Sequence, residues 1–221
     1  MAIALTTQRP VLEIDTLIDQ TNAASLTIYR GEFVLARCTT PTMMMRVVRL
    51  IAGLDPATTG HVRFMGEDWS TVRPETAGRL RGHLGLARRR PVWIDYMSLL
   101  QNLMLASLHH EQQSREVIAD QAAMLCRRMQ LPGAPLARPE QVGADELARA
   151  AIARAFMGDR RLVVLEAPDR SLLAPVVNLC RDLCRQGGAV LWLTTDRGFF
   201  SRPPFHARRV FLSQTSRETV S

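Results

Sequence analysis

The sequence has 221 residues, of which 47% are apolar, so the chain can fill a sizeable hydrophobic core. It carries 28 residues that are lysine or arginine against 21 acidic ones, a net charge of +7, and all 28 are arginine. The absence of lysine excludes every mechanism that needs this residue: an ammonium on the phosphates of a nucleotide, a Schiff base and a Ser-Lys dyad.

The excess of positive charge suits an acidic partner, which could be nucleic acid, an anionic lipid surface or an acidic protein patch. The exclusive use of arginine fits a GC-rich genome equally well. The first ten residues, MAIALTTQRP, lack the features of a signal peptide, and no apolar run reaches about 18 residues, so a cytoplasmic location is expected. Four cysteines fit no zinc spacing and are interpreted as buried thiols, with no metal site.

The first part of the chain alternates short extended runs with turn residues, which predicts three strands of one small sheet, at 11–14, 25–29 and 33–37. A helix is predicted from about Thr42 to Ala52, where Gly53 and Pro56 are typical of a helix end. A further strand is expected at 61–65.

Residues 71–90 are rich in arginine and broken by one proline and three glycines, whereas the apolar pattern of 95–130 is mostly helical. A loop with three prolines precedes a helix from Asp145 to Phe156. Strands and helices then alternate: strand 161–167, helix 171–186, strand 189–195, loop 199–205, strand 208–213 and a frayed tail. This order predicts an α/β fold whose sheet has mixed direction at the N-terminal end.

Six strings along the chain resemble, in order and spacing, the ATP-binding subunits of ABC transporters. They are TIYRGEFVLA before the phosphate loop, RVVRLIAGLDPATTGHVRFMGED after it, RLRGHLGL before the Gln loop, ELARAAIARAF after the family signature, RLVVLEAPDRSL at the magnesium-binding strand and VLWLTTD before the switch histidine. The resemblance covers about residues 10–213. Within the family, the compact length is similar to the small subunits of bacterial lipid, lipoprotein and cell-division complexes.

The resemblance implies a P-loop NTPase-like (ABC ATPase) core sheet with an antiparallel β subdomain and a helical subdomain in a single domain, 1–221. The implied parts are the β subdomain with the phosphate loop at about 1–70, the helical subdomain at about 90–157, the rest of the α/β core at about 158–213 and the tail at 214–221.

The chemistry of the phosphate loop does not carry over. Aligning RLIAGL with the family places residues 38–46 at the loop, where glycine amides and a lysine cradle phosphate and a hydroxyl holds magnesium. Here the first glycine is replaced by Cys38, an amide donor by Pro41, a small residue by Met43, the lysine by Met44, and the two hydroxyl residues by Met45 and Arg46. A rescue by Arg37 or Arg46 is the alternative. If no anion binds, Thr39, Thr40 or Thr42 is suited to cap the following helix, and the methionines would fill the space.

The residues at the family's other functional positions also differ from the family pattern. The Gln position is Arg89, the signature is Val142, Gly143, Ala144, Asp145 and Glu146, the base Glu is Ala167, the switch His is Thr195, and the Asp that closes the next loop is Leu173. Asp145 would set a carboxylate against phosphate, whereas Glu166 could still bind magnesium. We therefore expect no catalytic residue and no cofactor.

The leading hypothesis is a non-catalytic subunit, a pseudo-ATPase that docks on a membrane permease, on an active ATPase paralogue, or on both, at the inner face of a bacterial membrane. The candidate surface lies between Arg88 and Leu100 and offers Arg88, Arg89, Arg90, Trp93 and Tyr96, although ordinary core packing explains the aromatic residues equally well. The alternative is a working ATPase that uses ATP and Mg²⁺ with atypical motifs. Nucleic-acid binding is not expected, because the arginines are scattered through the chain.

Overall fold

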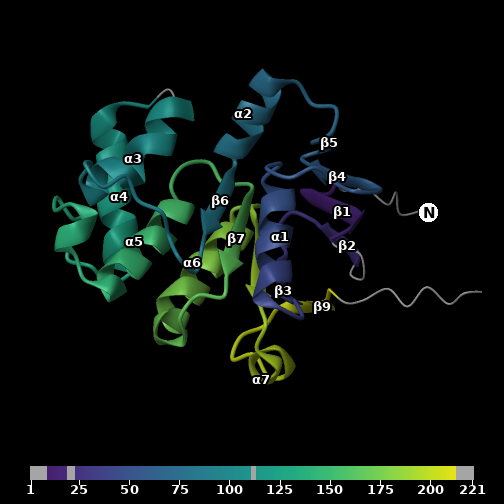
Figure 1. Cartoon of the computed structure of the whole chain (residues 1–221). Helices are drawn as coiled ribbons and strands as arrows, with labels where there is room; N and C mark the ends of the chain where they lie inside the picture. The colour runs from purple at the N-terminus through teal and green to yellow at the C-terminus, as the bar shows by residue number, and fades with distance from the viewer. Residues whose placement is uncertain (1–8, 19–22, 111–112, 213–221) are drawn as a thin grey trace, which may run out of the picture.

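The computed structural model describes residues 9–18, 23–110 and 113–212. Its centre is a five-stranded parallel sheet built, in spatial order, from β6 (Leu84–Ala87), β7 (Leu162–Glu166), β8 (Ala189–Thr194), β3 (Phe33–Arg37) and β9 (Arg208–Phe211). Figure 1 shows α1 (Pro41–Ile51) lying along this sheet, and a separate group of helices beside the β6 edge. The structure confirms the predicted α/β class.

The side chains of the central strands alternate between two hydrophobic cores, one on each face of the sheet. The core that includes α6 (Leu173–Arg185) receives Leu35, Val163 and Trp192. The core under α1 receives their neighbours Val34, Val164 and Leu191. Each of these six side chains is buried. For β7, which supplies Val163 and Val164, this confirms the strand covered on both faces that the apolar run at 161–167 predicted.

The predicted sheet membership of residues 33–37 is wrong. These residues form β3, which pairs in parallel with β8 and β9 in the central sheet. The small antiparallel sheet is built instead from β2 (Ala23–Ile28), β1 (Leu12–Leu17), β4 (His61–Phe64) and β5 (Glu67–Asp68), in that spatial order. A local pattern could not place β3, because both of its partners come from the other end of the chain.

The segment at 71–90 is more regular than its composition indicates, because it holds α2 (Pro74–Gly82) as well as β6. Pro74 starts the helix, where the missing N–H costs nothing. Gly85 lies inside β6, where a Cβ atom would stand 1.9 Å from the carbonyl oxygen of Ala155. The glycine is therefore required by a close backbone approach. The loop at 199–205 similarly begins inside a short helix, α7 (Arg197–Ser201).

The helices beside β6 are α3 (Leu99–His110), α4 (Arg115–Arg128) and α5 (Ala144–Ala155), which confirm the helical patterns at 95–130 and 145–156. Short 3₁₀ turns at Pro139–Gln141 and Arg170–Leu172 lead into α5 and α6. The boundaries near residues 70, 90 and 157 stay a prediction, and the tail at 214–221 lies outside the described residues, as do the first eight residues.

Within the described ranges, no helix combines the length and the apolar character needed to cross a bilayer. Cys38, Cys126 and Cys180 are buried thiols as predicted, whereas Cys184 is half-buried, and its thiol donates to the carbonyl oxygen of Glu32 at 3.4 Å.

Candidate functional site

The segments predicted to carry the site meet at one edge of the central sheet. Residues 38–46 follow β3, residues 88–90 follow β6, Ala167 follows β7 and Thr195 follows β8. Because these strands are parallel, their carboxyl ends lie at the same edge, which is where open α/β sheets bind ligands.

A cavity of about 450 Å³ opens at this edge, between the strand ends and the helices α5 and α7. Of the predicted site residues, it is lined by Arg88, Arg89, Glu166, Ala167 and Thr195. The remaining lining includes residues that sequence analysis did not single out, among them Ile152, Asp169, Arg170, Trp192, Asp196 and Phe199. Residues 38–46 and 142–146 do not line it.

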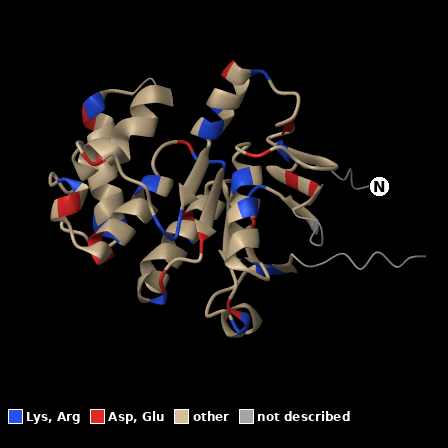
Figure 2. Cartoon of the chain, in the orientation of Figure 1, with Lys and Arg blue, Asp and Glu red and all other residues tan. Residues whose placement is uncertain are grey.

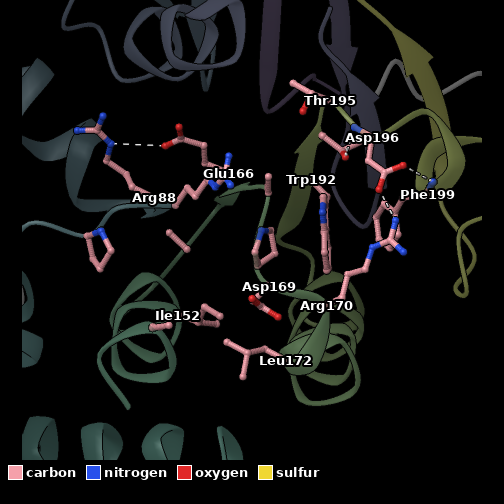
Figure 3. Close-up of a pocket in the computed structure, with 17 residues that line it drawn as sticks. Arg88, Ile152, Glu166, Asp169, Arg170, Leu172, Trp192, Thr195, Asp196 and Phe199 are labelled. Atoms are coloured by element: carbon pink, nitrogen blue, oxygen red, sulfur yellow. Dashed lines mark hydrogen bonds and ion pairs between the residues drawn. The ribbon is translucent and has the colours of Figure 1, made fainter. Parts of the chain in front are cut away.

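Glu166 faces an arginine. Its carboxylate is 3.6 Å from Nε of Arg88, and the two side chains point toward each other across one side of the cavity (Figure 3). The glutamate side chain is only 12% exposed, whereas that of Arg88 is 42% exposed. The next residue, Ala167, has a left-handed backbone with φ of +43° and offers no proton acceptor on its side chain. The end of β7 therefore holds one carboxylate, and that carboxylate is paired with a cation.

The opposite side of the cavity carries a second ion pair, between Arg170 and Asp196 (Figure 3). The N–H of Phe199 and the Arg170 guanidinium hold the pKa of Asp196 below its usual range. Arg170 also lies 5.5 Å from the ring centre of Phe199. Charged pairs therefore flank the cavity on both sides, and the ring of Trp192 stands between them.

Residues 38–46 comprise a short bend after β3 and the first residues of α1, which begins at Pro41. Thr40 is the N-cap, and its Oγ1 accepts the N–H of Met43 at 3.1 Å, which confirms the predicted threonine cap. Met43 and Met44 are buried in the core under α1, but Met45 is 41% exposed, so the methionine run fills space only in part. Burial raises the pKa of the Cys38 thiol to about 12.

We expect Thr40→Ala to lower the free energy of unfolding by about 1 kcal/mol, because the Met43 amide loses its acceptor. Thermal unfolding monitored by circular dichroism measures this as a loss of about 2–4 °C. Thr42→Ala is the control, since Thr42 is exposed on the same turn and the cap hydrogen bond belongs to Thr40. Equal losses in both variants would contradict a specific cap.

The side chain of Arg46 forms an ion pair with a residue outside the 38–46 segment. With Arg49 it binds the carboxylate of Asp55, which follows α1, and the Arg49 Nη2 atom lies 2.6 Å from an oxygen of Asp55. These hydrogen bonds hold the pKa of Asp55 below its usual range. Arg37 also has a neighbour, because its guanidinium lies over the ring of Phe211 at 4.8 Å. A rescue of phosphate binding by either arginine would require that arginine to leave its partner.

The signature segment lies at the start of α5, where Gly143 is the N-cap residue. Asp145 is exposed and accepts a hydrogen bond of 2.7 Å from Arg149, one turn along the helix. The carboxylate predicted to oppose a phosphate is thus paired within its own helix.

The structure separates the two aromatic residues predicted to bind a partner. Tyr96 is 75% exposed, whereas Trp93 is half-buried and packs against the core. Arg88, Arg89 and Arg90 are all exposed. Tyr96 can therefore contact a partner directly, and Trp93 already has neighbours within the chain.

A scan against protein-family models finds no match. Among curated proteins, the chain is 27% identical over 215 residues to lipoprotein-releasing system ATP-binding protein LolD 1 of Chlorobium chlorochromatii, covering 92% of this chain and 85% of the relative. It is 24% identical over 212 residues to octopine permease ATP-binding protein P of Rhizobium meliloti, covering 90% and 80%.

Solved structures agree on the fold. The dimeric structure of MJ0796, a bacterial ABC transporter cassette, matches with a TM-score of 0.77 and 20% identity over 91% of this chain and 93% of that one. The same cassette in a post-hydrolysis state bound to ADP and Pi matches with a TM-score of 0.73 and 19% identity, covering 93% of both chains. The fold of this chain is that of an ABC ATPase cassette.

These matches show that the expectation of no cofactor was wrong. The relatives are named ATP-binding proteins, and MJ0796 was solved with ADP and Pi. The side chains of residues 38–46 supply no ammonium for a nucleotide phosphate, because the chain has no lysine and Met44, the residue predicted at the family's lysine position, is buried. Glu166, the residue predicted at the family's magnesium position, has a carboxylate that could bind Mg²⁺, and it faces Arg88.

Proposed function

We propose that this chain, a relative of the ATP-binding subunits of ABC transporters, is a subunit of a bacterial membrane transport complex that contributes binding rather than ATP hydrolysis. The likeness to the lipoprotein-releasing protein LolD supports lipoprotein as the transported class. The chain is proposed not to hydrolyse ATP. Whether it binds ATP with Mg²⁺ is a separate property, to be measured on the isolated chain.

The arrangement at the end of β7 carries this proposal. A general base must be free to accept a proton from the attacking water. The family's base position is Ala167, and Glu166 beside it is held by Arg88 at 3.6 Å. The switch position, Thr195, has a hydroxyl but no imidazole. Ala167 and Thr195 carry no basic side chain, and the Glu166 carboxylate is paired with Arg88, so none of these three residues is a free base.

The proposed partners are an integral-membrane permease and an intact ATPase paralogue, at the cytoplasmic face of the membrane. For the permease we propose a cytoplasmic segment that carries apolar and acidic side chains. Val92 and Tyr96 are 70% and 75% exposed, and Arg89 and Arg90 lie exposed just before them in the chain. An apolar pair next to two cations is complementary to such a segment. Elsewhere arginines and acidic residues are interspersed over the elements, which does not favour nucleic acid (Figure 2).

We expect Tyr96→Ala to weaken permease binding by about 2 kcal/mol, or about 30-fold, because an exposed aromatic ring loses its contact area. The melting temperature should stay within about 2 °C of the parent, since the ring contributes little to the core. Leu54→Ala is the control, because Leu54 is also exposed, at 56%, and lies in the turn after α1 rather than beside the 91–98 segment.

The complex itself is tested with inside-out membrane vesicles from the bacterium that makes the chain. Purified chain is bound, washed and extracted, and native mass spectrometry of the extract is expected to show the chain in a fixed ratio with one integral-membrane protein. Liposomes of the same lipids are the comparison. Equal binding to protein-free liposomes would show that lipid, not a permease, holds the chain, and would contradict the proposal.

A further inference from the structure

The exposed residues Val92 and Tyr96 lie in a segment without regular secondary structure, residues 91–98, between β6 and α3. Such a segment is expected to lose much conformational freedom on binding, which weakens binding. Here, however, contacts from two helices restrain it. We infer that Arg154 of α5 is a positioning residue that fixes the 91–98 segment in the shape that presents Val92 and Tyr96 to the permease. The inference rests on the proposed function.

Arg154 holds the first part of the segment in two ways. Its guanidinium lies 4.2 Å from the ring centre of Trp93, and its Nη1 atom donates to the carbonyl oxygen of Val92 at 3.0 Å. One side chain therefore contacts two successive residues, and the contact with the indole face fixes the direction in which the segment leaves β6.

The surroundings of Arg154 indicate that this contact is specific. Burial lowers the pKa of Arg154, and none of the ion pairs between described residues supplies it with a carboxylate. A guanidinium that is removed from water needs other compensation, which here comes from the ring of Trp93 and the carbonyl of Val92. Trp93 in turn packs against the core. The two side chains support each other.

The second part of the segment is held by α3. Asn102 is buried, its Oδ1 accepts the N–H of Ile94 at 2.8 Å, and its Nδ2 donates to the carbonyl oxygens of Ile94, Met97 and Ser98 at 3.0–3.3 Å. Asn102 thus restrains the residues on both sides of Tyr96. With Arg154 on Val92 and Trp93, the exposed ring lies on a backbone that is held at both ends, so binding orders fewer residues.

The test uses Arg154→Met, which keeps most of the apolar stem but removes the charge and the donors. The first readout is amide hydrogen exchange of Ile94 and Met97, whose N–H groups bond to Asn102 and to the Ile94 carbonyl. These residues follow Val92 and Trp93 directly, so release of those two residues by the loss of Arg154 should also loosen the hydrogen bonds at Ile94 and Met97. The second is binding to the inside-out vesicles, and the third is the melting temperature. We expect about tenfold faster exchange at these two amides, about tenfold weaker vesicle binding and a change in melting temperature of less than about 3 °C.

Two further variants make the result specific. Arg127→Met is the matched control, because Arg127 is exposed on α4, and it should leave all three readouts unchanged. Arg154→Lys keeps a cation near Trp93 without the planar fork, so its values should lie between those of the parent and Arg154→Met. It also serves as the test variant if Arg154→Met melts early.

Unchanged exchange at Ile94 and Met97 in Arg154→Met would overturn the inference, and so would faster exchange with undiminished vesicle binding. Tyr96→Ala distinguishes the inference from the proposed function, because it should weaken vesicle binding without altering exchange. If Tyr96→Ala binds vesicles as the parent does, the docking surface is wrong, while the exchange data still decide whether Arg154 holds the segment.

Discussion

The purified chain is expected to release phosphate from Mg-ATP at least about 10³-fold more slowly than an intact ABC cassette assayed beside it. A general base alone contributes about 10² to 10⁴ in rate, and the residue predicted at its position is Ala167. The residue predicted at the lysine position is Met44, which is 1% exposed in the core and carries no charge. Because phosphoryl transfer depends on positioning and charge stabilisation, the loss of both groups should remove turnover.

A coupled phosphate-release assay measures this, and Glu166→Gln tests the remaining carboxylate. If the chain does not hydrolyse ATP, the parent and this variant should give the same background rate. Turnover close to that of the cassette, abolished by Glu166→Gln, would show that Glu166 leaves Arg88 to act in catalysis, and the proposed function would be wrong. ATP binding, measured separately by equilibrium dialysis, does not decide between these outcomes.

Trp192→Ala is expected to lower the free energy of unfolding by about 4 kcal/mol. Trp192 is 2% exposed at the centre of an aromatic group, with ring centres of Phe33, Phe199 and Phe205 at 5.1–6.4 Å. Removing its ring leaves a void that three neighbouring rings cannot close without moving. The loss includes both the buried area and the contacts between rings.

Urea unfolding followed by circular dichroism measures the effect, with Trp192→Phe as the matched control. Phenylalanine keeps a ring in the same place, so its cost should be well under half that of alanine. A cost below about 1.5 kcal/mol for Trp192→Ala would mean that the cavity beside this residue already admits water and that the aromatic group is loosely packed.

The sequence predicts which residues form the strands of the central sheet better than it predicts which strands pair with each other. The apolar run at 161–167 is typical of a strand covered on both faces, and β7 is such a strand. The family resemblance singled out Ala167 and Thr195, and the structure places both directly after neighbouring parallel strands, in the lining of one cavity. The sheet that takes β3 was not predicted, because strand order depends on pairing between distant segments and leaves no local pattern.

In the candidate site, too, contacts between segments that are distant in the chain could not be predicted. Tyr96 is exposed, whereas Trp93 packs against the core and against Arg154, which lies about 60 residues later, so a local pattern could not separate the two rings. The ion pair between Arg88 and Glu166 depends on β6 lying next to β7. Asp169, Arg170 and Asp196 line the cavity on short turns after β7 and β8, and their place after strand ends is the one sequence signal that could have identified them.

The position of β3 in the sheet also has a consequence for biosynthesis. β3 ends at Arg37, yet its neighbours β8 and β9 begin at Ala189 and Arg208, so about 150 residues are translated before the first of them exists. At roughly 5–20 residues per second, the apolar residues of β3 wait on the order of 10 s without a partner strand. During this interval an unpaired apolar strand can associate with other chains. The nascent N-terminal part is therefore where a ribosome-associated chaperone has most to protect.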